Sequence, residues 1–429
     1  MVRFSRRSLV TAGAFTPLIG SFTAHGAPLA GQGGRESAGG DDVWSWIVSQ
    51  YDVRPDLINV ENGNWGLMAR PVLEAYLAHT ERVNRDNSFF ARREFGAMAR
   101  EIIALVQARL NAGDNEVALT RGATEALQCI IGGYNGLQPG DAVMMADLDY
   151  GSIMEAMRFR AARSGAEVVT LNIPEGAGFE ALIEFYRQAF LAHPQTKLLL
   201  LTHISHRTGL MPPVREITEI AHQHGIDVVV DAAHSWGQVE FTVDDLGADF
   251  VGFNLHKWIG APIGVGAMYI RADKLSRIDQ NLSEVSGDRE RIQTRVHTGT
   301  SNFAAVMTVP DAFAFQDVLR RADKAGRLSA LRRIWVDAVR DVAGIEVLTP
   351  DDDRLHAGMT SFRFSGMTDA QSNRAIAEYL LERHNVFTVL RTGVASGACV
   401  RVTPGYYNTP EEMQIVSRAI LDAHRHFTA

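Results

Sequence analysis

The chain contains 429 residues, of which 46% are hydrophobic and 21% charged, and its formal net charge is −8 at pH 7. This length is enough for one large domain and a smaller one with a substantial buried core. A mildly acidic chain without a Lys/Arg run argues against a nucleic-acid-binding surface. Two cysteines, Cys129 and Cys399, are too few for a disulfide scaffold, and the fourteen histidines include no HExxH pattern, so we expect no structural metal.

The first forty residues differ in composition from the rest of the chain. "MVRFSRRSLVTAGAFTPLIGSFTAHGAPLA" has a basic start, a modest apolar stretch and a small-residue exit, which is the layout of a signal peptide rather than of a spanning helix. Arg6 and Arg7 resemble a twin-arginine export motif, and Ala24-His25-Gly26 offers a cleavage site. We therefore expect residues 1–40 to be a twin-arginine signal peptide and linker. The protein would be exported folded to the periplasm without stable membrane insertion; a disordered basic tail is the alternative.

From residue 41 onward, short apolar runs alternate with helical patterns. The runs typical of buried strands are "AVMMAD", "EVVTLNI", "KLLLLTHI", "IDVVVDAAH" and "DFVGFN". Between them lie the helix candidates "YGSIMEAMRFRAARSG", "GFEALIEFYRQAFLAH" and "PPVREITEIAHQHG", the last of which ends at Gly225, a good helix stop. This alternation predicts an α/β fold with a mostly parallel sheet, in which ligands bind beyond the carboxyl ends of the strands.

A long helix over "SNFAAVMTVPDAFAFQDVL", residues 301–319, is predicted to leave this sheet domain. The strand-like runs after it, "IEVLTP", "MTSFRFSG", "NVFTVLRTG" and "ACVRVTP", indicate a smaller mixed domain. We therefore expect a large domain, including the N-terminal segment, over residues 41–320 and a small C-terminal domain over residues 321–429.

An acid and an amine follow two neighbouring strands at the same edge of the predicted sheet. Asp231 ends "IDVVVD", where a buried carboxylate is costly unless a cation meets it. Lys257 follows "DFVGFN", between two apolar strands where a lysine amine is readily made neutral and nucleophilic. Pyridoxal phosphate needs this pair: a lysine for the imine and an acid to keep the pyridine nitrogen protonated. Taken singly, Asp231 could be a helix cap or part of a structural ion pair, and His234 a satisfied core histidine.

A cradle for the phosphate is predicted at "EVALTRGATEALQCIIGG", a short strand followed by a turn and a helix. Gly122 and Ala123 let the backbone approach an anion closely, and Thr124 adds a hydroxyl. Glu125 in the first turn suits the helix dipole. The stretch matches neither the Walker A nor the GxGxxG pattern, and a plain capped helix is the alternative.

The motifs "TRGATEAL", "DAAHSWGQ", "GFNLHKWIGAP", "HTGTSN" and "VRVTPGYYNTPEE" occur in this order along the chain. In order and spacing the chain resembles the class V aminotransferase family over roughly residues 58–425, and most closely the branch that contains isopenicillin N epimerase. The resemblance implies the PLP-dependent transferase fold of type I: a large domain with a mostly parallel seven-stranded sheet and a smaller C-terminal α+β domain. It also implies a homodimer with a shared active site.

The resemblance also implies which residues bind pyridoxal 5′-phosphate. Lys257 would form the imine and move the proton at Cα, Asp231 would hold the pyridine nitrogen, and His234 would lie near the ring oxygen. Tyr150 fits the position whose ring stacks on the cofactor, and Thr300 would reach the phosphate in the neighbouring subunit. The phosphate would be bound by Gly122, Ala123, Thr124, Asn254 and His256.

The substrate-binding residues are implied in the same way. Arg401 matches the arginine that grips the substrate carboxylate, a bidentate task suited to a guanidinium. His206 and Arg207 follow another strand end and would line the pocket. Asn62 and Asn64 in "NVENGNWG" would contribute from the N-terminal segment.

These residues define the cofactor rather than the reaction, because transamination, epimerisation and elimination can all begin with removal of the Cα proton. The resemblance implies an enzyme that acts at Cα of an amino acid or a peptide-borne amino acid. With the export signal, the chain resembles periplasmic enzymes of pyoverdine siderophore maturation, which tailor a secreted peptide. A C–S lyase or cysteine desulfurase is one alternative, although Cys399, two residues before Arg401 on an expected strand, favours a structural role. A non-catalytic exported binding protein on the same scaffold is another.

Overall fold

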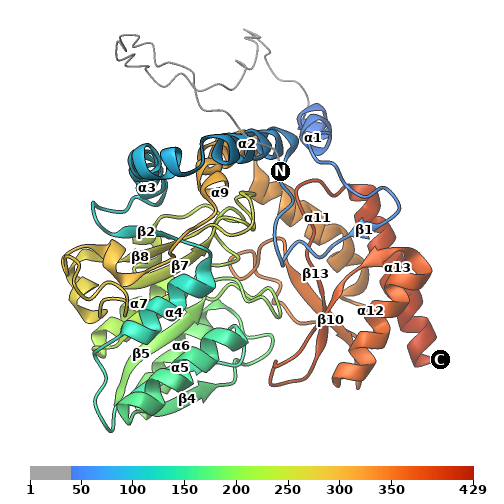
Figure 1. Ribbon diagram of the computed structural model, residues 1–429. Helices are drawn as coiled ribbons and strands as arrows, with labels where there is room; N and C mark the ends of the chain where they lie inside the picture. The colour runs from blue at the N-terminus through green and yellow to red at the C-terminus, as the bar shows by residue number, and fades with distance from the viewer. Residues whose placement is uncertain (1–39) are drawn as a thin grey trace, which may run out of the picture.

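The computed structural model describes residues 40–429, so the predicted twin-arginine signal peptide lies outside the described residues. Two parts lie side by side (Figure 1): a large α/β domain, drawn from blue to yellow, and a smaller domain built mainly from the orange and red C-terminal elements. Within residues 40–429, no helix combines the length and apolar character needed to cross a membrane.

A seven-stranded sheet forms the centre of the large domain, in the order β2-β8-β7-β6-β5-β3-β4. Neighbours from β7 to β4 are parallel, whereas β8 runs antiparallel to both β7 and β2. This confirms the predicted α/β fold with a mostly parallel seven-stranded sheet. The strands are β2 (Val117–Thr120), β3 (Ala142–Ala146), β4 (Glu167–Leu171), β5 (Thr196–Thr202), β6 (Asp227–Asp231), β7 (Phe250–Asn254) and β8 (Gly266–Ile270).

Helices cover both faces of this sheet, so its central strands are apolar on both sides. One face packs on α4 and α5 through side chains such as Leu127 and Met157, and the other on α3, α7 and α10 through side chains such as Val106 and Ile217. The helices of this part are α1 (Gly40–Val48), α2 (Arg70–Arg93), α3 (Phe95–Leu110), α4 (Ala123–Gly133), α5 (Gly151–Ser164), α6 (Phe179–Ala192), α7 (Val214–Gln223), α8 (Val243–Leu246), η1 (Ala272–Arg277), η2 (Ile292–Arg295), α9 (Phe303–Met307) and α10 (Val309–Arg321).

The sequence "EVVTLNI" forms a strand as predicted, but the prediction that this strand is buried is wrong. Strand β4 forms there, but it is the last strand of the sheet and its side chains are exposed or half-buried, with Val168 39% exposed. An edge strand has a neighbour on one side only, and an apolar run does not by itself distinguish an edge from a centre.

The single long helix predicted over residues 301–319 is wrong, because two helices, α9 and α10, meet at Thr308. Pro310 lies in the first turn of α10. Its ring removes a backbone donor and would clash with the preceding turn of a continuous helix, whereas the first turn of a new helix accepts it.

The smaller domain has a four-stranded antiparallel sheet in the order β12-β13-β10-β9, covered by three helices. Its core includes Trp335 and Phe362. The predicted mixed α+β character is therefore confirmed. The elements are α11 (Lys324–Val339), β9 (Ile345–Val347), β10 (Thr360–Phe364), α12 (Ala370–His384), β11 (Val386–Phe387), β12 (Val389–Arg391), β13 (Cys399–Val402) and α13 (Pro410–Thr428).

The N-terminal segment reaches across to the smaller domain (Figure 1). Strand β1 (Ile58–Asn59) pairs in parallel with β11, and Glu61 continues the contact as a bridge to Thr403. Val60 lies in the core of the smaller domain. The predicted division near residue 320 stays a prediction, but residues 58–61 pack with the C-terminal elements.

Candidate active site

The carboxyl ends of three neighbouring strands meet at one cavity of about 540 Å³. Thr202 of β5 pairs with Asp231 of β6, and Asp231 with Gly252 of β7, so the strand ends are in register. Asn254 ends β7. The predicted residues that line this cavity are Asn64, Gly122, Ala123, Thr124, Tyr150, His206, Asp231, His234, Asn254, His256, Lys257 and Arg401.

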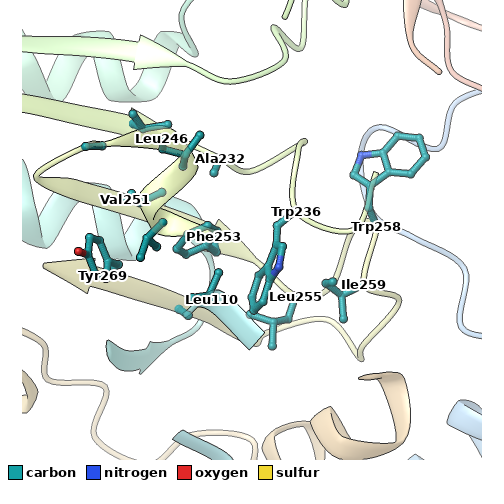
Figure 2. Packing of buried hydrophobic residues seen from close by; sticks show 14 of the residues in the cluster. Leu110, Ala232, Trp236, Leu246, Val251, Phe253, Leu255, Trp258, Ile259 and Tyr269 are labelled. Carbon is teal, nitrogen blue, oxygen red and sulfur yellow. The ribbon is translucent and has the colours of Figure 1, made fainter. Parts of the chain in front are cut away.

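A loop between β7 and β8 presents Lys257 to the cavity. Leu255, Trp258 and Ile259 beside it are buried in the hydrophobic cluster that continues beneath the sheet, together with Trp236 (Figure 2). From α10, the side chain of Gln316 donates to the carbonyl oxygens of Trp258 at 2.8 Å and Ile259 at 3.2 Å. Hydrophobic burial and these hydrogen bonds together fix the backbone that carries the lysine.

The amine of Lys257 lies 2.9 Å from Nε2 of His234. Desolvation by the surrounding protein lowers the pKa of Lys257 to about 7, with Asp231 opposing the shift and Arg401 adding to it. Burial, with a contribution from Lys257, holds the pKa of His234 well below its ordinary value. Near neutral pH the imidazole is therefore uncharged and a large fraction of the amine is neutral, which is the form that can act as nucleophile or base.

Asp231 is a buried carboxylate with few partners. Its Oδ1 accepts a hydrogen bond from the backbone N–H of Ala233 at 3.0 Å. Burial raises its pKa, while that hydrogen bond and Lys257 oppose the rise. A buried carboxylate is stabilised by a cation or a proton donor in the adjacent cavity. A protonated pyridine nitrogen has that chemistry.

A second carboxylate, Asp149, lies behind Thr202. Its Oδ1 accepts a hydrogen bond from the Thr202 hydroxyl at 2.7 Å, and its Oδ2 accepts one from the backbone N–H of Ala146 at 2.7 Å. Complete burial raises the pKa of Asp149 to about 7, against the opposing effect of these hydrogen bonds, and Asp231 adds to the rise. Asp149 was not predicted from the sequence, although it follows the carboxyl end of β3, where ligand-binding residues are expected.

Asp149 should make the cofactor-free protein less stable as the pH rises from about 4 to about 7. In this window the folded state holds a proton that the unfolded state has lost, so the free energy of unfolding should fall by up to about 4 kcal/mol. Asp149→Asn keeps the shape of the side chain. Its amide oxygen can still accept from the Ala146 N–H, and its NH2 group can donate to the Thr202 hydroxyl in place of the bond that the carboxylate accepts. The variant should remove that fall, measured by urea unfolding at several pH values. The exposed Asp114→Asn should retain it; an unchanged slope in Asp149→Asn would contradict the assignment.

The predicted phosphate cradle forms at the start of α4. No side chain caps this helix at Gly122, whereas the Ala123 N–H donates to Oδ1 of Asn254 at 2.8 Å. A Cβ added at Gly122 would lie 2.9 Å from Oδ1 of Asn254 and 3.1 Å from Cε1 of His256. Only glycine leaves this space open, at a helix N-terminus whose N–H groups favour an anion.

Tyr150 and His206 also line the cavity. Their rings meet edge to face, with centroids 5.1 Å apart, and Tyr150 is 41% exposed. Burial, together with Arg207 and Arg401, holds the pKa of His206 well below its ordinary value. The uncharged ring of His206 and the aromatic face of Tyr150 therefore offer a surface suited to a flat heterocycle.

Arg401 meets a glutamate that the sequence did not single out. The guanidinium is fully buried, and its Nη2 donates to Oε1 and Oε2 of Glu61 at 2.6 and 2.7 Å. Arg391 donates to the same Oε1 at 3.1 Å. Arg391 lines the cavity as well, although it was not predicted from the sequence.

Three predicted residues, Thr300, Arg207 and Asn62, do not line the cavity. Thr300 is exposed, and its reach into a neighbouring subunit stays a prediction. The guanidinium of Arg207 points instead toward Gly393, where an added Cβ would meet its Nη1 at 1.9 Å. Asn62 is buried and donates to the carbonyl of Thr403 at 2.9 Å, a structural contact beside the cavity.

Cys399 is buried on β13, 3.7 Å from the carbonyl oxygen of Arg207. Burial raises the pKa of its thiol to about 11. A thiol of this kind is poorly nucleophilic at neutral pH.

Among residues 40–429 there is no group of three or more His, Cys, Asp and Glu side chains placed to hold a metal ion.

The residues at the cavity fit pyridoxal 5′-phosphate on their own chemistry. The uncapped helix start at Gly122 suits the phosphate, and the buried, underpartnered Asp231 suits a protonated ring nitrogen. Lys257 supplies an amine that is readily neutral. All three lie at the same cavity.

Comparison with known proteins agrees with this fit. The sequence profile of the family described as aminotransferase class-V matches residues 70–416. Isopenicillin N epimerase of Streptomyces clavuligerus is 27% identical over 401 residues, which cover 88% of this chain and 97% of that protein. A probable cysteine desulfurase of Mycolicibacterium paratuberculosis is 27% identical over 320 residues, 71% of this chain and 46% of that protein.

A solved structure shares the fold. The cysteine desulfurase of Thermococcus onnurineus superposes with a TM-score of 0.76 at 18% identity, covering 89% of this chain and 98% of that one. At this identity the likeness concerns the fold alone. The family match over most of the chain is decisive: the protein belongs to the class-V aminotransferases and is a pyridoxal 5′-phosphate-dependent enzyme.

Proposed function

We propose that the protein removes and returns a proton at the α-carbon of an amino acid or of a peptide-borne amino acid. The observation that carries this proposal is Lys257, whose amine lies 2.9 Å from an uncharged His234 and has a pKa of about 7. An amine with that pKa can take up and release a proton near neutral pH.

Different side chains around the cavity would bind the cofactor, move the proton and orient the substrate. Bound pyridoxal 5′-phosphate supplies an electron sink for negative charge at Cα. Asp231 would hold the proton on the ring nitrogen, and the N-terminus of α4 would bind the phosphate. Lys257 would move the proton at Cα, with His234 as its hydrogen-bond partner. Arg401 would orient the substrate carboxylate.

Among reactions at Cα, an epimerase-like exchange agrees with the similarity to isopenicillin N epimerase. The cysteine desulfurases among the relatives support a C–S lyase or desulfurase equally well at the level of sequence comparison. Cys399 argues against a desulfurase, because a buried thiol with a raised pKa lacks the exposure and acidity of a sulfur-accepting cysteine. A C–S lyase needs no cysteine nucleophile, so sulfide release is the measurement that separates that candidate from an epimerase-like exchange.

Deuterium exchange tests the proposal directly. The purified, cofactor-loaded protein is incubated in D₂O with a panel of amino acids and short peptides, and exchange at Cα is followed by NMR. At least one compound should exchange its α-proton without releasing sulfide. A coloured protein that exchanges none would favour a binding protein, and sulfide from cysteine or cystine would favour the lyase.

A periplasmic location belongs to the same proposal and is supported only by the sequence of residues 1–40, with Arg6 and Arg7 at its start. An amino-acid tailoring step on a secreted peptide would agree with that location. Cell fractionation checks it, and an uncleaved chain confined to the cytoplasm would contradict it.

A further inference from the structure

The predicted substrate-carboxylate residue, Arg401, is already paired with a carboxylate of the protein. The Nη2 group of Arg401 donates to both carboxylate oxygens of Glu61, and Nη1 donates to the carbonyl oxygen of His206 at 2.6 Å. Glu61 is nearly enclosed, with its side chain 8% exposed. A substrate carboxylate that is to accept hydrogen bonds from Nη2 of Arg401 would therefore compete with Glu61 for the same donor.

A second arginine gives Glu61 another partner. Arg391 donates to Oε1 of Glu61 at 3.1 Å, so two guanidinium groups share one carboxylate and the cluster carries a net positive charge. The Nε groups of Arg391 and Arg401 are buried without a hydrogen-bond partner. The cluster therefore has both the charge and the free donors to accept one more anion.

Glu61 also has space into which it can withdraw. It lines a neighbouring cavity of about 580 Å³, on which Arg391 also borders, whereas Arg401 borders the active-site cavity. Gly63 lets the guanidinium of Arg401 lie close to the chain, since a Cβ there would be 2.3 Å from Nη2. A short movement toward the neighbouring cavity would free Arg401 and leave Glu61 on Arg391.

We propose that Glu61 is a built-in competitor for the substrate carboxylate and thereby a specificity-determining residue. A substrate with a free α-carboxylate binds Arg401 only after it displaces Glu61. This displacement lowers the affinity that the carboxylate would otherwise gain over an amide at the same position. The inference rests on the proposed function and narrows it: the site is relaxed toward amino acids whose carboxyl group is amide-linked, as in the N-terminal residue of a peptide.

Calorimetric titration with succinate and with its neutral analogue succinamide tests this role. Inorganic phosphate is included to fill the cradle at α4, ionic strength is held constant, and the full chain is used both with and without cofactor. Wild type should distinguish the two probes by less than roughly tenfold, and Glu61→Gln should bind succinate roughly tenfold or more tightly than wild type, with succinamide unchanged. Succinate binding that is unchanged or weaker in Glu61→Gln would overturn the proposal.

Two further variants distinguish competition between Glu61 and the substrate carboxylate from a general effect of breaking a buried ion pair. Arg391→Gln leaves Glu61 to Arg401 alone and should weaken succinate binding; stronger binding would count against the proposal. Glu175→Gln breaks a similar two-oxygen pair with the buried Arg363, away from the cavity, and should leave succinate binding at the wild-type value.

Removal of Glu61 leaves two arginine charges close together and could prevent folding. In that case the double variant Glu61→Gln/Arg391→Gln is compared with Arg391→Gln, and it should bind succinate roughly tenfold more tightly; no gain would refute the competition. These titrations do not depend on turnover. An absence of Cα–proton exchange with this binding pattern intact would reject the proposed function and leave the role of Glu61 standing.

Discussion

Lys257→Ala should abolish turnover, lowering the rate of Cα–proton exchange by roughly 10⁴-fold, while the protein remains folded. The purified variant should also lose the visible absorption band of covalently attached cofactor. The reason is local: no other amine borders the active-site cavity within residues 40–429, and burial keeps the pKa of Lys257 at about 7.

Two controls define what Lys257 contributes. Lys257→Arg keeps a cation in place but cannot become a neutral amine, so it should be as inactive as Lys257→Ala. Lys274→Ala removes a half-buried lysine that pairs with Asp227 and Asp249 away from the cavity, and it should keep both colour and exchange. A Lys257→Ala protein that keeps the band and the exchange would show that the cofactor is attached elsewhere.

The centre of the site could be predicted because it follows from the alternation of buried strands and helices along the chain. Asp231 and Lys257 come just after two buried apolar runs, and parallel strands bring their carboxyl ends to one edge of the sheet. The cradle at Gly122 follows from the same rule. These residues needed no knowledge of long-range packing.

The outer wall of the site could not be predicted, because it depends on contacts between distant parts of the chain. Glu61 and Arg401 are 340 residues apart, and they meet because β1 pairs with β11 and Glu61 bridges to Thr403. A two-residue strand has no periodicity that a sequence could display. The exposed edge strand β4 is a second case, since its apolar sequence resembles that of the central strands.

Gly66→Ala should impair both stability and activity, because this glycine lies directly against the backbone of Lys257. A Cβ at residue 66 would be 1.9 Å from the carbonyl oxygen of Lys257, and the Gly66 N–H donates to the carbonyl of His256 at 2.9 Å. The added Cβ can be accommodated only if the N-terminal segment around Gly66 or the loop that carries Lys257 moves. We expect a loss of about 2–4 kcal/mol in the free energy of unfolding, measured by urea denaturation.

The displacement of the Lys257 backbone in Gly66→Ala should also lower the reaction rate. A shift of about 1 Å at a reacting group can cost roughly 100-fold in rate, so Gly66→Ala should lower Cα–proton exchange by about that factor even where the protein is folded. Gly132→Ala is the matched control: Gly132 is an exposed residue of α4, an added Cβ there meets no atom within 4 Å, and alanine should raise stability by roughly 0.5–1 kcal/mol with exchange unchanged. Equal stability and exchange in Gly66→Ala and wild type would mean that residues 62–66 do not pack on the Lys257 loop. In that case Glu61, five residues before Gly66 in the same segment, would also lose the support that holds it beside Arg401.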